Sequence, residues 1–345
     1  MKKVLALIMV AAAVLAVALL PSLGTAAEAP VKLGLGHVTS IASSKDKTVA
    51  ANGSVTPAMA QVDTVFAAVA FDAAGRITHV SIETAQTKVN YDADMNVTSD
   101  LSAPGKTKKE LGDDYGMRRA SAIKKEWFEQ IAEFEKWMIG KTVDEVKNLP
   151  VKRRDASHTH VPDVPELTST VTITVQDYIA AVVEAWETAR PVAPGGVKLG
   201  LGHDISIAKS TSSAAQVDLT MAAALFDKDG KVVEVIIDTA QTKVAFDADG
   251  KVTTDKAGEF LTKKELQDGY GMRKASSIKR EWFEQMLDFE KWMLGKTVDE
   301  ITSLPTKRRD ASHVAVPDVP ELTSTVTITV EGYLAALAEA YENAQ

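Results

Sequence analysis

The heptapeptide Val31–His37, VKLGLGH, returns unchanged as Val197–His203. The longer stretch Val161–Val175, VPDVPELTSTVTITV, recurs letter for letter as Val316–Val330, 155 positions later. From Gln61 onward the two copies align at that spacing without a further gap. Solenoid repeats measure roughly 20 to 50 residues, whereas this repeat has the size of a whole domain. We therefore predict two copies of one module.

The first residues are typical of an export signal. Lys2 and Lys3 precede the apolar run Val4–Leu20, and Gly24–Ala27 supplies the small residues that a signal peptidase requires. We expect residues 1–27 to be a cleaved signal peptide. A retained anchor is the alternative, because the apolar run approaches the roughly 17 to 25 residues that span a bilayer. Either way, the sequence predicts a secreted or extracytosolic protein, at the cell surface or in the periplasm.

Composition limits the possible classes of site and partner. The chain has no cysteine, which excludes a lipid anchor on cysteine, disulfides, thiolate metal sites and a cysteine nucleophile. The formal net charge of −8 becomes −10 once Lys2 and Lys3 are removed, and this acidic balance argues against a nucleic-acid partner. We expect two globular modules, 28–189 and 197–345, joined by a linker at 190–196 that contains prolines and glycines.

Each module begins with strand patterns. Gly34–Ile41 is predicted to be a strand, and Gln61–Phe71 and Ile77–Val89 are two more, rich in Val, Ile, Thr and Ala. The turn residues Asp72–Gly75 between them predict a hairpin. The copies differ in length only within 45–59, which indicates a surface loop there.

Helical patterns follow in the second part of the module. Apolar residues at three- and four-residue spacing predict a helix over Ala120–Gly140, and Thr142–Glu145 is a capping box that begins a shorter helix. Thr168–Thr188 fits both a strand and a helix. A helix beginning near Ser169 would offer free backbone N–H groups to an anion such as a phosphate. The predicted fold class is α+β, with a small, mainly antiparallel sheet and packed helices in each copy.

One segment of each copy resembles a known attachment motif. Glu166–Thr172, ELTSTVT, which recurs as Glu321–Thr327, resembles the threonine-attachment motif of FMN-binding domains. In that family an acidic residue stands six positions before a threonine, within a Ser-Gly-Ala-Thr stretch, and FMN is joined through its phosphate to the threonine hydroxyl. Here Glu replaces the usual Asp, and Thr170-Val171 replaces Gly-Ala. The order of motifs along the module also resembles exported bacterial proteins grouped with these domains. The residues that match the motif are Glu166, Ser169 and Thr172 in the first copy and Glu321, Ser324 and Thr327 in the second.

The resemblance implies an exported electron carrier with covalent FMN at Thr172 and Thr327. It implies a flavin transferase that recognises Glu166 and Glu321, and membrane or extracellular redox partners. A carrier of this kind needs no catalytic residue of its own. Two alternatives remain open: a module that binds a small ligand noncovalently, and a secreted binding or structural module with the same fold and no flavin.

Other polar motifs have simpler interpretations. The arginines of Lys152–His158 could hold a phosphate or dock an acidic partner, or the segment could be a solvated charged loop. Asp155, Ser157 and His158 share letters with a hydrolase triad, but residues so close in sequence cannot easily align for catalysis. His37 and His203 follow a strand and have no clustered ligand partners in the sequence, so we interpret them as structural and predict no metal site.

Overall fold

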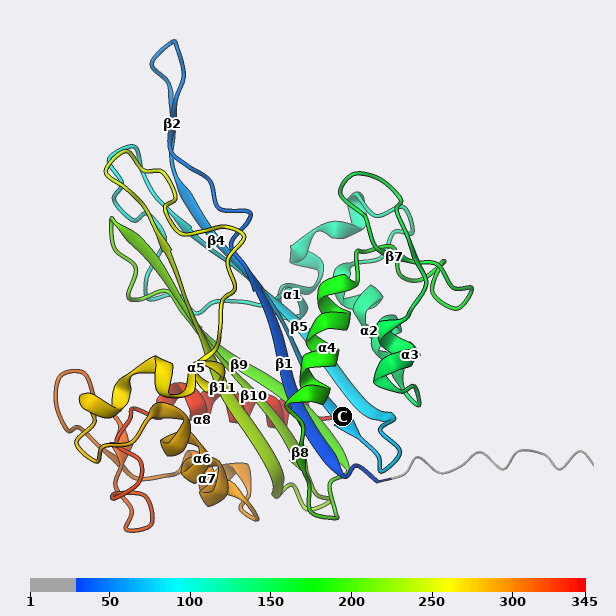
Figure 1. Cartoon of the computed structure of the whole chain (residues 1–345), viewed down its shortest axis with the longest axis vertical. Coiled ribbons are helices and arrows are strands. Elements are labelled where there is room, and N and C mark those ends of the chain that lie inside the picture. The colour runs from blue at the N-terminus through cyan, green and yellow to red at the C-terminus, as the bar shows by residue number, and fades with distance from the viewer. Residues whose placement is uncertain (1–28) are drawn as a thin grey trace, which may run out of the picture.

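The computed structural model describes residues 29–345, and the predicted signal peptide at 1–27 lies outside the described residues. Within 29–345, no helix combines the length and the apolar character needed to cross a membrane. The two repeats have the same architecture, in which an antiparallel sheet carries helices on one face (Figure 1). The predicted α+β fold is confirmed.

The sheet of the first repeat consists of β1 (Lys32–Ser40), β4 (Met59–Phe71), β5 (Ile77–Asn90) and the short β8 (Arg190–Pro191). Their order is β5-β4-β1-β8, and each neighbouring pair is antiparallel. The turn Asp72–Gly75 joins β4 to β5, so the predicted hairpin is confirmed.

The sheet of the second repeat follows the same plan. It contains β9 (Lys198–Ser206), β10 (Ala214–Phe226) and β11 (Val232–Ala245), in the order β11-β10-β9. Its hairpin runs from Ala214 opposite Ala245 to the turn after β10, with a register shift near Phe226.

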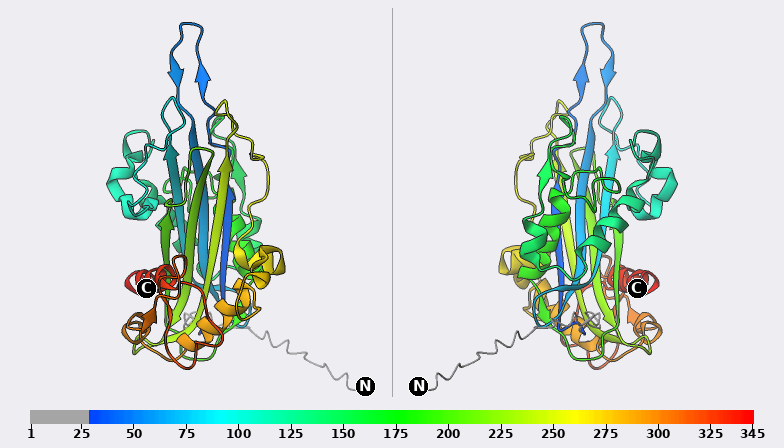
Figure 2. Two further views of the ribbon diagram at one scale, coloured as in Figure 1. Left: turned by 90° about the vertical axis from the view of Figure 1, so that its left-hand side faces the viewer. Right: turned by 90° about the vertical axis from the view of Figure 1, so that its right-hand side faces the viewer.

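The two sheets pack face to face and share one core. Leu33 and Phe66 of the first repeat lie in the same buried cluster as Leu199 and Met221 of the second. Alternating strand residues point into this core, because successive side chains of a strand face opposite sides of a sheet. The repeats are therefore halves of one sandwich rather than separate domains, as the side views in Figure 2 show.

Helices cover the two outer faces of the sandwich. In the first repeat these are α2 (Trp127–Met138), α3 (Val143–Lys147) and α4 (Gln176–Glu187), which pack with the outer side chains of their own sheet. Their counterparts in the second repeat form a separate cluster with the other sheet. These are α6 (Trp282–Met293), α7 (Val298–Thr302) and α8 (Glu331–Glu342). The layer order is helix, sheet, sheet, helix.

Short elements complete the described chain. They are β2 (Thr48–Val49), β3 (Val55–Thr56), α1 (Lys108–Leu111), η1 (Gly112–Tyr115), η2 (Met117–Arg119), β6 (Val151–Lys152), β7 (Val161–Pro162), α5 (Lys263–Leu266), η3 (Gln267–Tyr270), η4 (Met272–Lys274), β12 (Thr306–Lys307) and β13 (Val316–Pro317). The length-variable segment 45–59 carries β2 and β3 as an exposed hairpin that projects from one end of the sandwich (Figure 2).

Two helix predictions need correction. The helix predicted from Ala120 begins at Trp127, because the Glu126 carboxylate accepts the N–H groups of Met117 and Arg118 at 2.8 and 2.7 Å and holds the preceding chain in turns. The ambiguous segment Thr168–Thr188 is helical only from Gln176. The residues at 165–170 form turns, so Ser169 does not open a helix.

The repeated GLG motif lets a helix lie directly on a strand. A Cβ at Gly34 would lie 1.7 Å from the carbonyl oxygen of Ala185 on α4, and one at Gly36 would lie 2.1 Å from that of Ala181. Only glycine leaves room for such an approach. The close contact brings Glu184 of α4 beside His37, the residue that follows the motif.

Candidate functional site

The predicted acceptor Thr172 lies beside an arginine at the base of α4. Its side chain is half-buried, and its Oγ1 and backbone N–H both donate to Gln130 Oε1, at 3.2 and 2.8 Å. Arg154 Nη1 donates to the Thr172 carbonyl oxygen at 3.0 Å. Thr172 is therefore partly accessible, and a guanidinium is hydrogen-bonded to its carbonyl oxygen.

Thr327 repeats this environment in the second half. Its Oγ1 and N–H donate to Gln285 Oε1 at 3.3 and 2.8 Å, and Arg309 Nη1 donates to its carbonyl oxygen at 3.0 Å. Since α4 and α8 cover different sheets, the two threonines belong to opposite outer layers of the sandwich.

The other residues of the motif are placed differently. Glu166 and Ser169 are exposed in the turns before Thr172, as are Glu321 and Ser324 before Thr327. Val171, which replaces the family's alanine, is fully buried in the outer core, so its extra bulk points away from solvent. Thr170, which replaces the family's glycine, is half-buried.

The basic loop before β7 is organised by one carboxylate. Asp155 accepts from the backbone N–H groups of Ser157 and His158 at 2.8 and 2.9 Å, and His158 Nδ1 lies 2.8 Å from the same oxygen. The hydrogen bond from His158 holds the pKa of Asp155 well below its usual range. These contacts form a turn that presents Arg154 to Thr172, rather than an aligned nucleophile and base.

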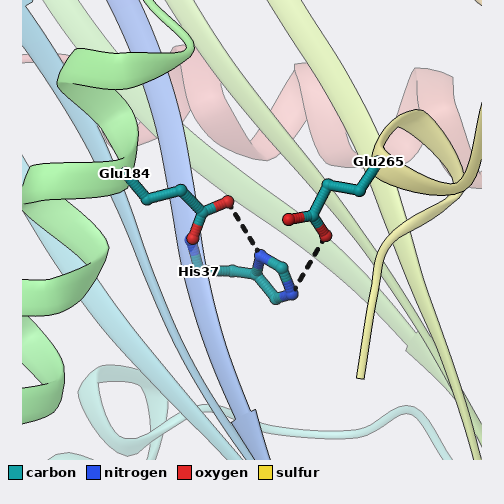
Figure 3. A group of neighbouring side chains, drawn as sticks. All are labelled: His37, Glu184 and Glu265. Carbon is teal, nitrogen blue, oxygen red and sulfur yellow. Dashed lines mark hydrogen bonds and ion pairs between the residues drawn. The ribbon is translucent and has the colours of Figure 1, made fainter. Parts of the chain in front are cut away.

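A second candidate site lies on the seam between the repeats (Figure 3). His37 is buried, and its ring Nδ1 lies 3.2 Å from Glu184 Oε1. The backbone N–H of His37 donates to the other carboxylate oxygen, Glu184 Oε2, at 2.9 Å. Its Nε2 faces the second repeat, at 3.2 Å from the Phe260 carbonyl oxygen and 3.7 Å from Glu265 Oε2. One histidine thus joins a carboxylate of its own repeat to a carboxylate of the other.

His203 forms the matching cluster on the other side of the seam. Its Nδ1 lies 2.9 Å from Glu339 Oε1 and its Nε2 3.0 Å from Glu110 Oε2. Glu110 also accepts the N–H of Thr107 at 2.7 Å, so the carboxylate that caps α1 reaches across to the other repeat. We call these two clusters the seam triads.

The residue types of a seam triad could bind a metal ion, but their geometry favours a protonated histidine. Three possible ligand atoms lie within 4.8 Å of one another in each triad. However, the two carboxylates face opposite ring nitrogens of His37, so a metal ion on Nε2 would meet Glu265 and not Glu184. An imidazolium, with a proton on each nitrogen, satisfies both carboxylates at once.

Charge and hydrogen bonding around His37 agree with the protonated form. Burial lowers the pKa of the ring, but the hydrogen bond and charge of Glu184 outweigh it and raise the pKa of His37 to about 9. The pKa of His203 is raised in the same way, against burial, by Glu339. The sequence did not reveal this cluster, because Glu184 lies 147 positions from His37.

Two adjoining cavities open beside the His203 triad. One, of about 500 Å³, is lined by Glu83, Lys109, Glu110 and His203 among others, and the next, of about 620 Å³, reaches His79 and Glu135. Both lie between the repeats, and they share Ser81, Lys109, Asn343 and Gln345 as lining residues. No local pattern predicts these cavities, because residues of both repeats line them.

Comparison with known proteins gives one partial match to report. A chlorophenol reductase from Desulfitobacterium hafniense is 31% identical over 137 residues, which cover 35% of this chain and 42% of that protein. The chain thus spans less than half the length of this distant relative. No protein-family model matches the chain. No solved structure matches it either.

Proposed function

We propose that this chain is a redox protein, an exported electron carrier with one FMN esterified to Thr172 and another to Thr327. The observation that carries the proposal is the shared environment of the two threonines, each of which is half-buried and has an arginine hydrogen-bonded to its carbonyl oxygen. The partial similarity to a protein named chlorophenol reductase supports a redox role.

The residues at each threonine fit a phosphate ester. An ester oxygen at Thr172 Oγ1 would place the phosphate near Arg154, whose guanidinium can hold phosphate oxygens through charge-assisted hydrogen bonds. The Oγ1 of Thr174 is buried and has no hydrogen-bond partner among the described residues, and the same is true of Thr329 Oγ1. The flavin would supply the electron-transfer chemistry itself.

Attachment of FMN to the threonines requires a partner enzyme, a flavin transferase. This enzyme would recognise the exposed Glu166 and Glu321 and transfer the FMN phosphate from a flavin dinucleotide to the threonine hydroxyl. The pyrophosphate bond of the donor breaks, a nucleoside monophosphate leaves, and the hydroxyl proton is released. The loaded carrier would then exchange electrons with membrane or extracellular redox proteins. Covalent attachment suits an exported protein, because free cofactor would diffuse away outside the cell. Because Thr172 and Thr327 belong to opposite outer layers, each flavin would face its own partner.

Intact-mass spectrometry of the protein purified from its own host tests this proposal. We expect a gain of about 438 Da per repeat, the mass of FMN less water, on the purified chain. Thr172→Ala and Thr327→Ala should each lose one such increment, and the double variant both. Thr168→Ala and Thr323→Ala, which change exposed threonines of the same segments, are the matched controls and should keep both.

A second candidate function follows from the hydrogen bond between Thr172 and Gln130. If that bond serves only to fix the segment, the module is a secreted binding or structural domain. The purified chain would then have its unmodified mass in a host that attaches flavin to other proteins, and Thr172→Ala would change stability alone. That result would overturn the flavin proposal.

A further inference from the structure

The two halves of the sandwich differ at the position of Arg190, where the repeats meet. Arg190 is the first residue of the predicted linker, and Gln345 stands at the equivalent place, 155 positions later. Each of these two residues pairs through its backbone with the first strand of its own repeat's sheet. Arg190 lies opposite Leu33 in the pairing of β8 with β1, and Gln345 exchanges backbone hydrogen bonds of 3.0 and 3.1 Å with Leu199. Their backbones are equivalent, so their side chains start from equivalent positions.

The guanidinium of Arg190 occupies a pocket of the second repeat, which we call the receptor and which is formed by Glu290, Glu234 and Val235. Its Nη1 donates to Glu290 Oε2 at 2.8 Å, and its Nη2 donates to Glu234 Oε1 at 2.7 Å and to the Val235 carbonyl oxygen. The other oxygen of Glu290 accepts from Ile237 N–H at 2.7 Å. With Arg190 in place, the Glu290 side chain is 2% exposed.

The first repeat has the same receptor without the arginine. Glu135 stands in the place of Glu290, and its Oε1 accepts from Ile82 N–H at 2.6 Å and from Lys109 Nζ at 2.9 Å. Among the described residues, no side chain donates to Glu135 Oε2, the oxygen that corresponds to the one Arg190 binds. The side chain of Glu135 is 16% exposed, compared with 2% for Glu290.

A large cavity occupies the space where a guanidinium would lie. Its volume is about 620 Å³, and Glu135, His79 and Gln345 line it. The cavity on the Arg190 side, with Arg190 in its wall, measures about 230 Å³. Ala132 lines the larger cavity where Leu287 lines the smaller one, which widens the space further.

The lining suits a cation with an alkyl chain. Glu135 shares the larger cavity with Lys109 and Lys136. The adjoining cavity adds His203 and the four carboxylates of Glu83, Glu110, Glu339 and Glu342, so carboxylates outnumber cationic groups by five to three over the two cavities together. Phe128 and Ile139 give the larger cavity an apolar wall. His79 takes the place of Glu234, and burial lowers its pKa, so it stays neutral and can accept a hydrogen bond.

We propose that this cavity binds the guanidinium group of a small alkylguanidine, in the manner in which the opposite receptor binds Arg190. The ligand donates to Glu135 Oε2 and to the carbonyl oxygen of Val80, which corresponds to that of Val235. Its alkyl chain lies along Phe128 and Ile139. The site is independent of the flavin attachment proposed above, because Thr172 and Thr327 lie on the outer layers.

Isothermal titration calorimetry of the whole chain with agmatine, an alkylguanidinium probe, tests the proposal. We expect one agmatine per wild-type chain. Gln345→Arg should place the chain's own guanidinium in the cavity, weaken binding at least tenfold and raise Tm by about 2 to 4 °C. Arg190→Gln should leave the receptor at Glu290 without its own guanidinium, so that two agmatine molecules bind per chain. Glu135→Gln, which removes the charge but keeps an amide oxygen for Ile82 N–H, should weaken binding.

1,4-Diaminobutane, which has an ammonium in place of the planar guanidinium of agmatine and keeps the second ammonium, is the matched control ligand and should bind at least tenfold more weakly. Binding of agmatine that is unchanged in Gln345→Arg would overturn the proposal, because the probe would then sit elsewhere. Failure of agmatine to bind wild type at millimolar concentration would overturn it as well. If Arg190→Gln fails to fold, the comparison of wild type with Gln345→Arg still decides.

Discussion

At the residue scale, the proton on His37 should make stability depend on pH. The folded pKa of about 9 lies above the ordinary histidine pKa of 6.5, so the folded state binds this proton more tightly than the unfolded state. The stabilisation is fully present below about pH 6.5 and is lost as pH rises through 9. Its size is on the order of 3 kcal/mol. Urea unfolding at pH 6 and pH 9.5 should show this decrease.

Substitution separates His37 from other titrating groups. His37→Gln should lower the free energy of unfolding at pH 6 more than at pH 9.5, and His203 should account for a further part of the pH dependence. His160→Gln alters an exposed histidine that forms no ion pair among the described residues, and it should leave the pH profile of wild type unchanged. A free energy of unfolding that stays constant from pH 6 to 9.5 would contradict the doubly hydrogen-bonded imidazolium.

At the element scale, the packing of α4 on β1 depends on two glycines. Gly36→Ala would place a methyl group 2.1 Å from the Ala181 carbonyl oxygen, so helix and strand must separate. We expect a loss of about 3 kcal/mol in the free energy of unfolding, near the upper end for overpacked sites. Urea denaturation measures it. Gly269→Ala, where a Cβ meets nothing within 4 Å, is the control and should change stability by less than about 0.5 kcal/mol.

The same elements show how far local patterns predict structure. Gln61–Phe71 and Ile77–Val89 were predictable as a hairpin because strand composition and the turn between them are local signals. The start of α2 was not, since Glu126 fixes the preceding turns through contacts with Met117 and Arg118. The start of α4 at Gln176 was also not predictable, because the apolar residues before it fit both the two-residue period of a strand and the 3.6-residue period of a helix.

The seam triads were missed for a different reason. Their members come from segments far apart in the chain, and one carboxylate of each triad belongs to the other repeat. Identity between the copies gave no help, because a duplicated chain is alike at most positions. A usable signal was Glu184 on the otherwise small-residue face of α4, formed by Ala181 and Ala185 against the GLG strand.

At the scale of the whole molecule, the shared core predicts that neither repeat is stable as a separate monomer. The inner faces of both sheets, with Leu33 and Phe66 on one and Leu199 and Met221 on the other, are buried only against each other. An isolated repeat would expose this apolar face, and exposed faces of that kind drive association. Fragments 29–192 and 197–345 should therefore aggregate or self-associate alone and form a one-to-one complex when mixed, as sedimentation velocity can measure. A folded, monomeric fragment 197–345 would contradict a shared core.

The seam triads should control the affinity of that complex. Glu110→Gln in one fragment and Glu265→Gln in the other each remove a charge that reaches across the seam to a histidine. Removing one partner of a buried charge pair typically costs several kcal/mol, because the remaining charge is left without compensation. At pH 6 the doubly substituted pair should dissociate at least tenfold more readily than the wild-type pair, whereas above pH 9, where His37 loses its proton, the difference should shrink. A difference equally large at both pH values would mean that the carboxylates act by packing or helix capping, since Glu110 and Glu265 also cap α1 and α5.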